Sequence, residues 1–410
     1  MEQNVFDTIV IGSGPAGLAA AYAAAVSDQS VAVIEKQPRP GMKLLASGGG
    51  RCNVTNILSG ENFAVKFGRQ WRFMMPALQH FSGSRLLDFF SSHQVPLVLT
   101  DGFHYFPASG KAADVLKLFT GEISGHGGRI FCSEKVTALI PGDKWQVITS
   151  ERSFICRNVI CCCGGRGYPA LGGSMAGFDL VRALGHTVTP LYPAMTGVIC
   201  ADERIGECAG ISMPDCVAEI AVKGQERLSA RGELLFTHRG FSAFAILDLA
   251  GQCARLIEKN GSVPLKIDFL PDMSFADVEN MFADWRKEGG NRHISTLMNQ
   301  HLHVPRRIAG LLLEGDDPEI SRWQRASSAL LAQKLKASVF QLSGVESWDK
   351  AMVTAGGVSL KEVSPHTLES KIHKGLFFAG EMLDLAGPCG GYNITWALAS
   401  GFLAAGGVEF

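Results

Sequence analysis

One stretch near the N-terminus constrains the fold more than any other part of the chain. Asp7–Glu35 reads DTIVIGSGPAGLAAAYAAAVSDQSVAVIE. Its first apolar run, Thr8–Ile11, predicts a buried parallel strand, and the alanine-rich run Leu18–Val26 predicts a helix. A second apolar run, Val31–Ile34, predicts a further strand that ends at Glu35. Strand, glycine turn, helix, strand and acid in this order indicate a dinucleotide-binding unit.

The glycine turn, GSGPAG, has the spacing that a bound dinucleotide requires. Gly12 permits the tight turn, Gly14 lets the backbone approach a pyrophosphate, and Gly17 lets the helix pack closely on the strand. The helix N-terminus presents N–H groups and a positive dipole end to the phosphates. Glu35 lies 18 residues after Gly17, where its carboxylate is placed to accept hydrogen bonds from ribose hydroxyls.

Length and composition exclude several classes of protein. A chain of 410 residues with 46% hydrophobic and 19% charged residues is globular and long enough for two or three domains. The net charge of −1 gives no electrostatic footprint for nucleic acid. No apolar run approaches the ~18 residues of a membrane span, and the acidic start MEQNVFD lacks the basic region of a signal peptide. The eleven cysteines are therefore expected to be reduced thiols in a cytoplasmic protein.

A glycine run follows the predicted ribose-binding strand. Ser47–Gly50, SGGG, loses too much backbone entropy to hold a regular element comfortably. Such a run lets the backbone pass close to a flat or anionic group, and Arg51 and Asn53 add a cation and an amide directly after it. Its position favours a cofactor contact over the alternative, a flexible surface loop. Cys52 has no CxxC partner, and we predict that it does not form a redox pair with Cys389.

The next hundred residues read as helices followed by short strands. Residues 61–100 are amphipathic and predicted to be helical, with their aromatic side chains in the core. An aromatic loop, GFHYFPASGK, leads into a predicted helix, Ala112–Ile123. Strands are then predicted at Val136 with Ala138–Ile140, at Trp145–Thr149, at Ser153–Cys156 and at Asn158–Cys163.

Two motifs in this part have a tempting functional interpretation that we reject. Cys161–Cys163 are interpreted as small apolar strand residues, because adjacent residues alternate faces and cannot share one tetrahedral ion. We therefore expect no metal site. Gly165–Ala170 matches GxGxxA, but Pro169 and the lack of a following helix, strand and acid make a second nucleotide site improbable.

The composition shifts at about Pro190, and residues 191–350 are interpreted as an insertion. Short strands are predicted at Ala194–Cys200, Val217–Val222 and Leu265–Phe269, and a helix at Ala243–Leu256. Residues 275–340 are mostly helical in pattern. The predicted helices there are Phe275–Trp285, His293–Asn299, Arg306–Leu313 and Ala326–Lys336.

The last sixty residues indicate which dinucleotide is bound. Val353–Val358 is a strand-to-turn signal, and Gly375–Asp384 is a buried strand closed by Gly380 and Glu381. GPCGGYN then precedes a helix, predicted at Ile394–Ala405. An acid at the end of that strand suits a ribityl hydroxyl, and a helix N-terminus suits the pyrimidine end of a reduced flavin. NAD needs neither feature, so the predicted cofactor is FAD.

The motifs GSGPAGLAAA, SGGGRCNVTN, GELLFTHRGFS, TAGGV and FFAGEMLDLAGPCGGYNITWALASG together resemble a bacterial family of FAD-dependent flavoproteins. Its members are known as aminoacetone oxidase-like, 3-dehydro-bile-acid reductase-like or uncharacterised flavoproteins. The resemblance covers the whole chain. It implies an α/β fold, with a glutathione-reductase-type (Rossmann-like) FAD-binding domain that is split in sequence by an inserted β-barrel and helical subdomain. One departure concerns Gly172–Gly177, GGSMAG, where relatives usually have a run like GSTGDG with an acid.

The resemblance and the motifs together predict the domain borders and the cofactor site. Residues 1–190 and 351–410 form the FAD-binding domain, and 191–350 the insertion, with the barrel at about 191–270 and 337–350 and the helices at about 271–336. The predicted cofactor-binding residues are Gly12, Gly14, Pro15, Ala16, Gly17, Glu35, Lys36, Lys43, Gly49, Gly50, Arg51, Cys52, Asn53, Val136, Gly164, Gly165, Gly357, Gly380, Glu381, Gly391, Tyr392 and Asn393.

Three functions remain open at this point. The first is an FAD-dependent oxidoreductase that transfers hydride through flavin N5 between NAD(P)H or an organic donor and a small-molecule acceptor. The second is an amine or aminoketone oxidase that uses dioxygen, and the third is a non-catalytic flavoprotein such as a redox sensor or an RNA-modification accessory. The sequence contains no strong acid–base pair; His104, Lys111, His238 and Arg239 are the catalytic candidates. We expect a small-molecule substrate and no nucleic-acid or membrane partner, and the oligomeric state stays open.

Overall fold

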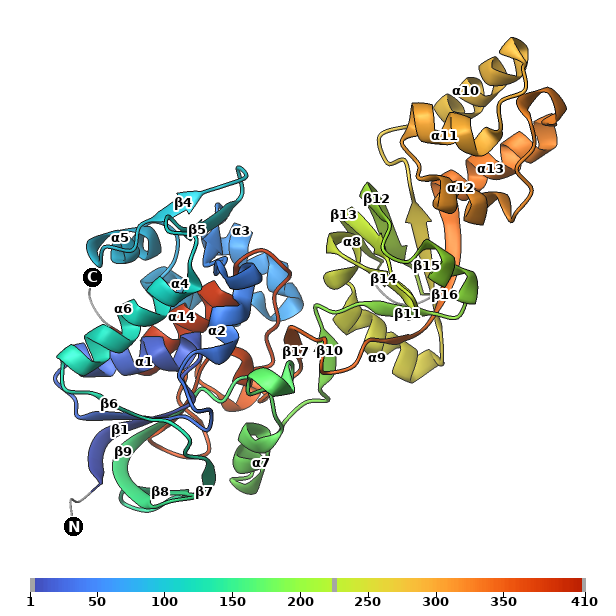
Figure 1. Ribbon diagram of the computed structural model, residues 1–410. Helices are drawn as coiled ribbons and strands as arrows, with labels where there is room; N and C mark the ends of the chain where they lie inside the picture. Colours follow the sequence, from blue (N-terminus) through green and yellow to red (C-terminus); the bar gives the residue numbers. More distant parts are fainter. Residues whose placement is uncertain (1–3, 223–226, 408–410) are drawn as a thin grey trace. The chain divides into compact units, whose positions relative to one another are not determined.

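The computed structural model describes residues 4–222 and 227–407, and the chain divides into two compact units (Figure 1). The first unit comprises Met1–Tyr192 and Val353–Phe410, and the second comprises Pro193–Met352. The sequence-based borders fell at 190 and 350, so the second unit corresponds to the expected insertion.

The first unit is built on a sheet of parallel strands in the order β6-β2-β1-β9, with β18 on the other side of β9. The central strands are apolar and buried on both faces, as helix-covered parallel strands must be. β18 comes from the C-terminal segment, so the last strand of this sheet follows the second unit in the sequence. The strands are β1 Val5–Ile11, β2 Val31–Ile34, β6 Arg129–Phe131, β9 Ser153–Cys161 and β18 Leu376–Phe378.

β9 is one strand, where the sequence predicted two that were separated at Arg157. β1 pairs with β9 from Val5 to Ile11, so the ladder continues through the charged residue. Arg157 forms an ion pair with Asp7 at 2.6 Å on the exposed side. The first half of β9 also pairs antiparallel with β8 (Trp145–Thr149), which pairs with β7 (Val136–Ile140).

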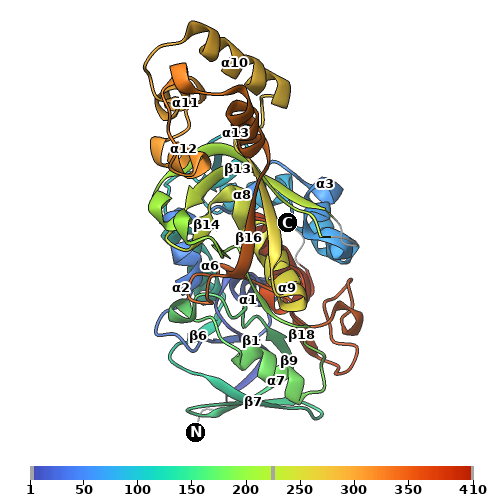
Figure 2. The same ribbon diagram turned by 90° about the vertical axis from the view of Figure 1, so that its right-hand side faces the viewer.

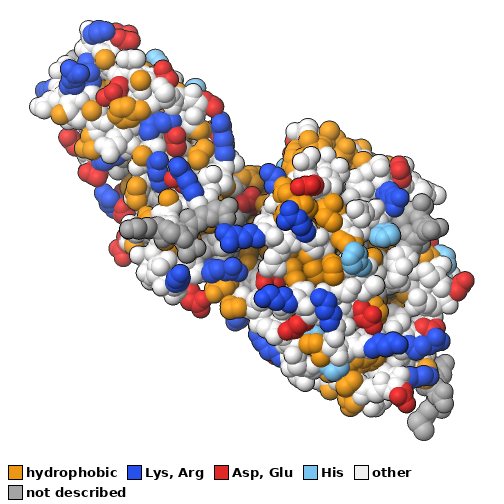
Figure 3. All heavy atoms as spheres, turned by 180° about the vertical axis from the view of Figure 1, so that it is seen from behind, with side chains coloured by type: hydrophobic (Ala, Val, Ile, Leu, Met, Phe, Trp, Pro, Cys, Tyr) orange, Lys and Arg blue, Asp and Glu red, His pale blue; other side chains and the backbone are white. Residues whose placement is uncertain are grey.

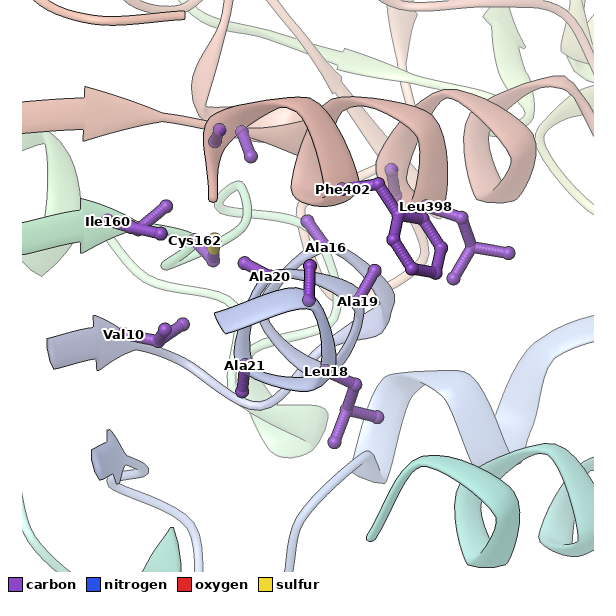
Figure 4. Close-up of a cluster of buried hydrophobic side chains, with 14 of the residues drawn as sticks. Val10, Ala16, Leu18, Ala19, Ala20, Ala21, Ile160, Cys162, Leu398 and Phe402 are labelled. Atoms are coloured by element: carbon purple, nitrogen blue, oxygen red, sulfur yellow. The ribbon is translucent and has the colours of Figure 1, made fainter. Parts of the chain in front are cut away.

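Two helices with many small residues pack together over this sheet. Helix α1 (Pro15–Val26) lies against helix α14 (Tyr392–Ala404), and a Cβ on Gly401 of α14 would lie 2.2 Å from the carbonyl oxygen of Ala16. Figure 4 shows Ala16 and Ala19 beside α14, with Leu398 and Phe402 next to them. The two backbones approach this closely because Gly401 has no side chain. Helix α6 (Ala112–Gly125) packs on α1 as well.

The segment before α6 differs in part from the prediction. It is helical over α3 (Gly60–Ala64), α4 (Met75–His80) and α5 (Ser84–Ser92), and its aromatic residues are in the core as expected. The predicted helical region up to residue 100 is wrong at its end, because α5 ends at Ser92, Gln94 has a left-handed φ of +62°, and β4 follows. The strands of a small antiparallel sheet, in the order β3-β5-β4, are β3 Thr55–Asn56, β5 His104–Pro107 and β4 Leu97–Leu99.

The second unit contains a closed barrel in the strand order β11-β14-β13-β12-β15-β16. Closure leaves no unpaired edge. Four helices between β15 and β16 lie together at one end of the barrel (Figures 1 and 2). The barrel strands are β11 Val198–Cys200, β12 Ser212–Ile220, β13 Leu228–Phe236, β14 Gly240–Ser242, β15 Val263–Asp268 and β16 Ser338–Val345. The four helices are α10 Phe275–Glu288, α11 Ile294–Leu302, α12 Arg306–Leu313 and α13 Arg325–Ala337.

Two predicted elements of the second unit are corrected by the structure. The helix predicted at Ala243–Leu256 is two helices, α8 (Phe244–Leu247) and α9 (Ala250–Asn260). The strand predicted at Ala194–Cys200 is also two, β10 (Tyr192–Ala194) and β11, because Met195 between them has a φ of +48°. A residue in that left-handed region interrupts an extended strand.

Within the described residues, no helix has the length and the apolar character needed to cross a membrane.

Candidate functional site

The glycine turn before α1 has the geometry that its sequence predicted. Gly12 has a φ of +98°, and a Cβ there would lie 2.5 Å from the carbonyl oxygen of Cys162. A Cβ on Gly17 would lie 1.9 Å from the carbonyl oxygen of Gly12. A Cβ on Gly14 would meet no described atom within 4 Å, and no side chain caps α1. The fold therefore needs Gly12 and Gly17, whereas open space surrounds Gly14 at the N-terminus of the helix, next to Pro15 and Ala16.

Glu35 at the end of β2 is buried and already holds this turn in place. One carboxylate oxygen accepts hydrogen bonds from the backbone N–H of Ser13 (2.8 Å) and from its hydroxyl (2.6 Å). The other accepts from the backbone N–H of Gln37 (2.8 Å). A carboxylate has about four acceptor positions, so one is left for the ribose hydroxyl that the sequence predicted.

Lys36 and Val136 lie close to Glu35. The backbone N–H of Glu134, two residues before Val136, donates to the carbonyl of Glu35 at 2.9 Å. Lys36 donates from Nζ to the hydroxyl of Ser174 at 2.6 Å, and its burial lowers the pKa of the ammonium group. Ser174 belongs to the GGSMAG run that departs from the usual family pattern.

The SGGGRCN loop is irregular at its glycines. Gly48, Gly49 and Gly50 have φ values of 56°, 67° and 87°, and a Cβ on Gly49 would meet no described atom within 4 Å. The Arg51 guanidinium lies 4.5 Å from the ring centre of Phe106. Cys52 is fully buried, and burial raises the pKa of its thiol to about 12. A thiol that stays protonated is a poor nucleophile.

A second carboxylate lies at the carboxyl end of β18 and joins several segments. Glu381 forms an ion pair with Lys43 (3.0 Å) and accepts a hydrogen bond from the backbone N–H of Thr354 (2.7 Å). Gly165 has no room for a side chain, because a Cβ there would lie 2.2 Å from the hydroxyl of Thr354 and 2.3 Å from Glu381. Gly164 has a φ of +69° and, as at Gly14, a Cβ there would meet no described atom within 4 Å.

Two further glycines shape the same region. Gly357 has a φ of +156°, and a Cβ there would lie 2.6 Å from the backbone of Leu383. Gly380 has a φ of +65°, and its Cβ would lie 2.9 Å from the side chain of Ala16 in α1. The segments of Gly357, Gly380 and Glu381 thus meet at the carboxyl ends of β9 and β18, the usual place for a ligand of such a sheet.

The loop before α14 is held by side chains from distant parts of the chain. Asn393 accepts from the backbone N–H of Gly387 and donates to its carbonyl, both at 2.9 Å. Asn56 donates to the carbonyl of Gly390 at 2.7 Å. Asn53, with its amide oriented to satisfy both contacts, donates to Thr55 and accepts from the N–H of Gly391 at 3.2 Å. Gly391 precedes Tyr392, the buried first residue of α14.

His104 is the catalytic candidate that lies at this loop. A Cβ on Gly390 would lie 3.0 Å from Nε2 of His104. Nδ1 of His104 lies 2.6 Å from a carboxylate oxygen of Asp101. Hydrogen bonds from His104 lower the pKa of Asp101 to about 2. Sequence reasoning missed Asp101, although Asp-Gly before a strand is a turn signal in which the aspartate bonds to the following backbone.

The other three catalytic candidates are exposed. Lys111 is the residue before α6. His238 and Arg239 belong to the second unit, in the tight turn between β13 and β14 that is closed by a hydrogen bond from Thr237 to Gly240 (2.8 Å). In the described part of the chain, no cluster of three or more His, Cys, Asp or Glu residues is arranged to hold a metal ion.

These features fit FAD. The open helix N-terminus at Gly14 suits a pyrophosphate, Glu35 has an acceptor position for a ribose, and the α14 N-terminus suits a group that gains negative charge. Gly49 and Gly164 leave space that a side chain would fill. Ser13, Ser174, Thr354 and Asn56 position these groups, and sequence reasoning missed all four.

Comparisons with known proteins identify the family to which the chain belongs. Residues 6–407 match a family described as "HI0933-like protein Rossmann domain". The chain is 31% identical over 409 residues to a 3-dehydro-bile acid delta(4,6)-reductase of Clostridium scindens, covering 96% of this chain and 97% of that one. It is 28% identical over 417 residues to a ribosomal RNA dihydrouridine synthase of Escherichia coli, covering 98% and 97%. A flavocytochrome c3 fumarate reductase in its open conformation has a similar fold, with a TM-score of 0.50, 14% identity and coverage of 98% and 78%.

Proposed function

Because the chain belongs to the HI0933-like Rossmann domain family and is an FAD-dependent oxidoreductase, we propose that it is a reductase of carbon–carbon double bonds conjugated to a carbonyl group. The observation that carries this proposal is the full-length similarity to the bile acid reductase. The names of both relatives describe the addition of hydrogen to a ring double bond conjugated to a carbonyl, in a 3-oxo steroid acid or in a uracil ring. A small cyclic enone is therefore the proposed substrate class.

When bound and reduced, FAD would supply the hydride, and with it the two electrons, for such a reduction. The residues of the chain hold the cofactor and adjust its charge. The open turn at Gly14 receives the pyrophosphate, and Glu35 and Glu381 accept hydrogen bonds from hydroxyl groups. The N-terminus of α14 would favour negative charge on the pyrimidine ring of a bound flavin.

We propose a reduced nicotinamide as the electron donor. The chain has one strand–GxGxxG–helix unit, and the second motif, after Gly165, leads into a 3₁₀ helix at Pro169–Leu171. Without a phosphate cradle of its own, NAD(P)H should bind weakly, at about 0.1–1 mM. Donor and acceptor then use one site in turn, which gives ping-pong kinetics.

The test is anaerobic reduction of the purified flavoprotein by NADH or NADPH, followed by mixing with cyclohex-2-en-1-one or a 3-oxo-4,6-diene bile acid. We expect bleaching of the flavin by the donor, its return with the enone, and parallel lines in initial-rate plots. Return of the colour only with dioxygen, after reduction by an amine or aminoketone, would favour an oxidase. A flavin that no donor reduces would favour a non-catalytic flavoprotein.

A second substrate has support from the dihydrouridine synthase relatives, which match over nearly the whole chain. Uridine in RNA carries the same conjugated bond as an enone. However, the net charge is −1, and on the face in Figure 3 acidic and basic side chains are intermingled. RNA binding relies on clustered positive charge, so we favour the small molecule. Unmodified ribosomal RNA as acceptor in the same assay separates the two.

A further inference from the structure

Asp101 and His104 form a carboxylate–imidazole pair in the turn that precedes β5. One oxygen of Asp101 accepts from the backbone N–H of Phe103 (3.1 Å) and of His104 (2.8 Å). The other oxygen lies 2.6 Å from Nδ1 of His104. The carboxylate therefore fixes both the backbone and the ring. With Nδ1 bound to the carboxylate, Nε2 is the atom that takes up or releases a proton.

Nε2 points at the loop before α14. A Cβ on Gly390 would lie 3.0 Å from it. Strand pairing sets this position, because His104 lies opposite Asn56, and Asn56 donates to the carbonyl of Gly390 at 2.7 Å. Among the described residues, Nε2 has no hydrogen-bond partner, and the imidazole side chain is 23% exposed. A proton-transfer atom without a partner therefore faces the helix N-terminus to which the flavin pyrimidine ring is assigned above.

Another histidine of the same unit shows what a purely structural pair looks like. His186 is buried, with Nδ1 3.2 Å from Glu362 and Nε2 2.9 Å from the hydroxyl of Ser370. Both of its ring nitrogens are used, so it has no atom to offer a ligand. His104 has the same carboxylate partnership but keeps one nitrogen accessible.

We propose that His104, oriented by Asp101, is the catalytic acid that protonates the α-carbon of the enone. This inference rests on the proposed function. The β-carbon receives hydride, the π electron pair moves toward the carbonyl, and the α-carbon takes the proton from Nε2, so that the C=C bond becomes C–C with two new C–H bonds. The substrate gains two electrons, which come from the reduced nicotinamide. His104 is left neutral and regains its proton from water. Asp101 is a positioning residue.

The experiment compares His104→Gln with His126→Gln, a matched control. His126 is an exposed histidine with a carboxylate neighbour, Glu122, at 3.8 Å near the end of α6, away from the loop. Flavin reduced anaerobically with dithionite is mixed with the enone. A lost general acid costs about 10²–10⁴-fold, so we expect H104Q to slow flavin reoxidation at least a hundredfold and H126Q to change it less than twofold. Asp101→Asn should slow flavin reoxidation less than H104Q does and should shift the pH profile of the rate. Asp101→Glu, which keeps a carboxylate, should restore the rate.

A readout without turnover examines the histidine directly. The visible spectrum of the oxidised holoprotein is recorded from pH 5 to 9. We expect the pH dependence of the flavin spectrum to be the same in the wild type and in H126Q and altered in H104Q, with unchanged FAD affinity in all three. A wild-type rate and pH profile in folded, FAD-loaded H104Q would overturn the role of His104 while the reductase function stands. A wild type that reduces no enone would overturn the proposed function, and with it the role of His104 as acid.

Discussion

The two glycine-rich helix N-termini of the first unit are built in opposite ways. At α1, the turn is formed by residues close in the chain. A side chain at Gly12 or Gly17 would overlap backbone atoms, and Glu35, at the end of the next strand, accepts a hydrogen bond from Ser13. At α14, the loop is held by Asn56, from a segment more than 300 residues earlier, and has His104 beside it. The N-terminus of α1 has no side chain that would block a pyrophosphate. The N-terminus of α14 is surrounded by polar side chains, as a reacting ring requires. Four predictions test this contrast.

The largest effect is expected at α1, where Gly17→Ala and Gly14→Ala should separate folding from binding. The new methyl group of G17A would overlap the carbonyl oxygen of Gly12, at 1.9 Å, and we expect a stability loss of about 3 kcal/mol or more. G14A meets no described atom, so its stability should stay within about 0.5 kcal/mol while its FAD affinity falls at least tenfold. Urea denaturation midpoints and FAD content measure the two. Equal stability of the two variants would contradict the assignment.

Glu35→Ala should weaken FAD binding at the same end. The carboxylate has one free acceptor position and also fixes the turn through Ser13. Loss of one charged hydrogen bond costs about 1.5–3 kcal/mol, so the FAD dissociation constant should rise about tenfold or more. Ser13→Ala, which removes only the hydroxyl bond, is the control and should have a smaller effect. An unchanged affinity in E35A would make Glu35 a structural acid alone.

Asn393→Ala should affect the reactive end. It removes the two bonds at 2.9 Å that close the loop on Gly387, each worth about 0.5–1.5 kcal/mol. We expect a stability loss of about 1–3 kcal/mol and a more negative flavin reduction potential, because the N-terminus of α14 is no longer held against the ring. Spectroelectrochemistry measures the potential. If E35A shifts the potential as much as N393A, the two ends do not have separate roles.

The smallest effect is expected at the two cysteines near this site. Cys52 is buried with a thiol pKa raised to about 12, so it is no thiolate at neutral pH. The double variant Cys52→Ser/Cys389→Ser should keep its flavin reduction rate within a fewfold. A hundredfold loss, or a charge-transfer band that disappears in the variant, would indicate a disulfide reductase mechanism instead.

The raised pKa of the Cys52 thiol also makes the stability of the protein depend on pH, so all these measurements should be made below about pH 9. The unfolded thiol releases its proton near pH 9.0, whereas the folded thiol keeps it up to about pH 12. The unfolded state therefore binds fewer protons between these values, and stability should fall as the pH rises above about 9. Denaturation midpoints should decrease less steeply in Cys52→Ser.

The sequence alone determined most of the first βαβ unit, whose features depend on neighbours close in the chain. The strand Val31–Ile34 and the helix Arg306–Leu313 were predicted without error, whereas β1 and α1 were predicted with correct C-terminal ends but begin three residues earlier than expected. Apolar periodicity and steric demands on Gly12 act locally, so they are visible in the order of residues. FAD as the cofactor followed from the last sixty residues, where Glu381 ends a strand and GPCGGYN precedes a helix.

Tertiary structure decided what depends on residues far apart in the chain. β9 runs through Arg157 because β1 lies beside it, β18 joins the sheet after a long insertion, and six strands close into a barrel. The meeting of His104 with Gly390 has the same origin. Such contacts form only when distant segments pack and bury their apolar faces together. The free energy that favours them depends on the assembled core, so a local sequence pattern does not predict them.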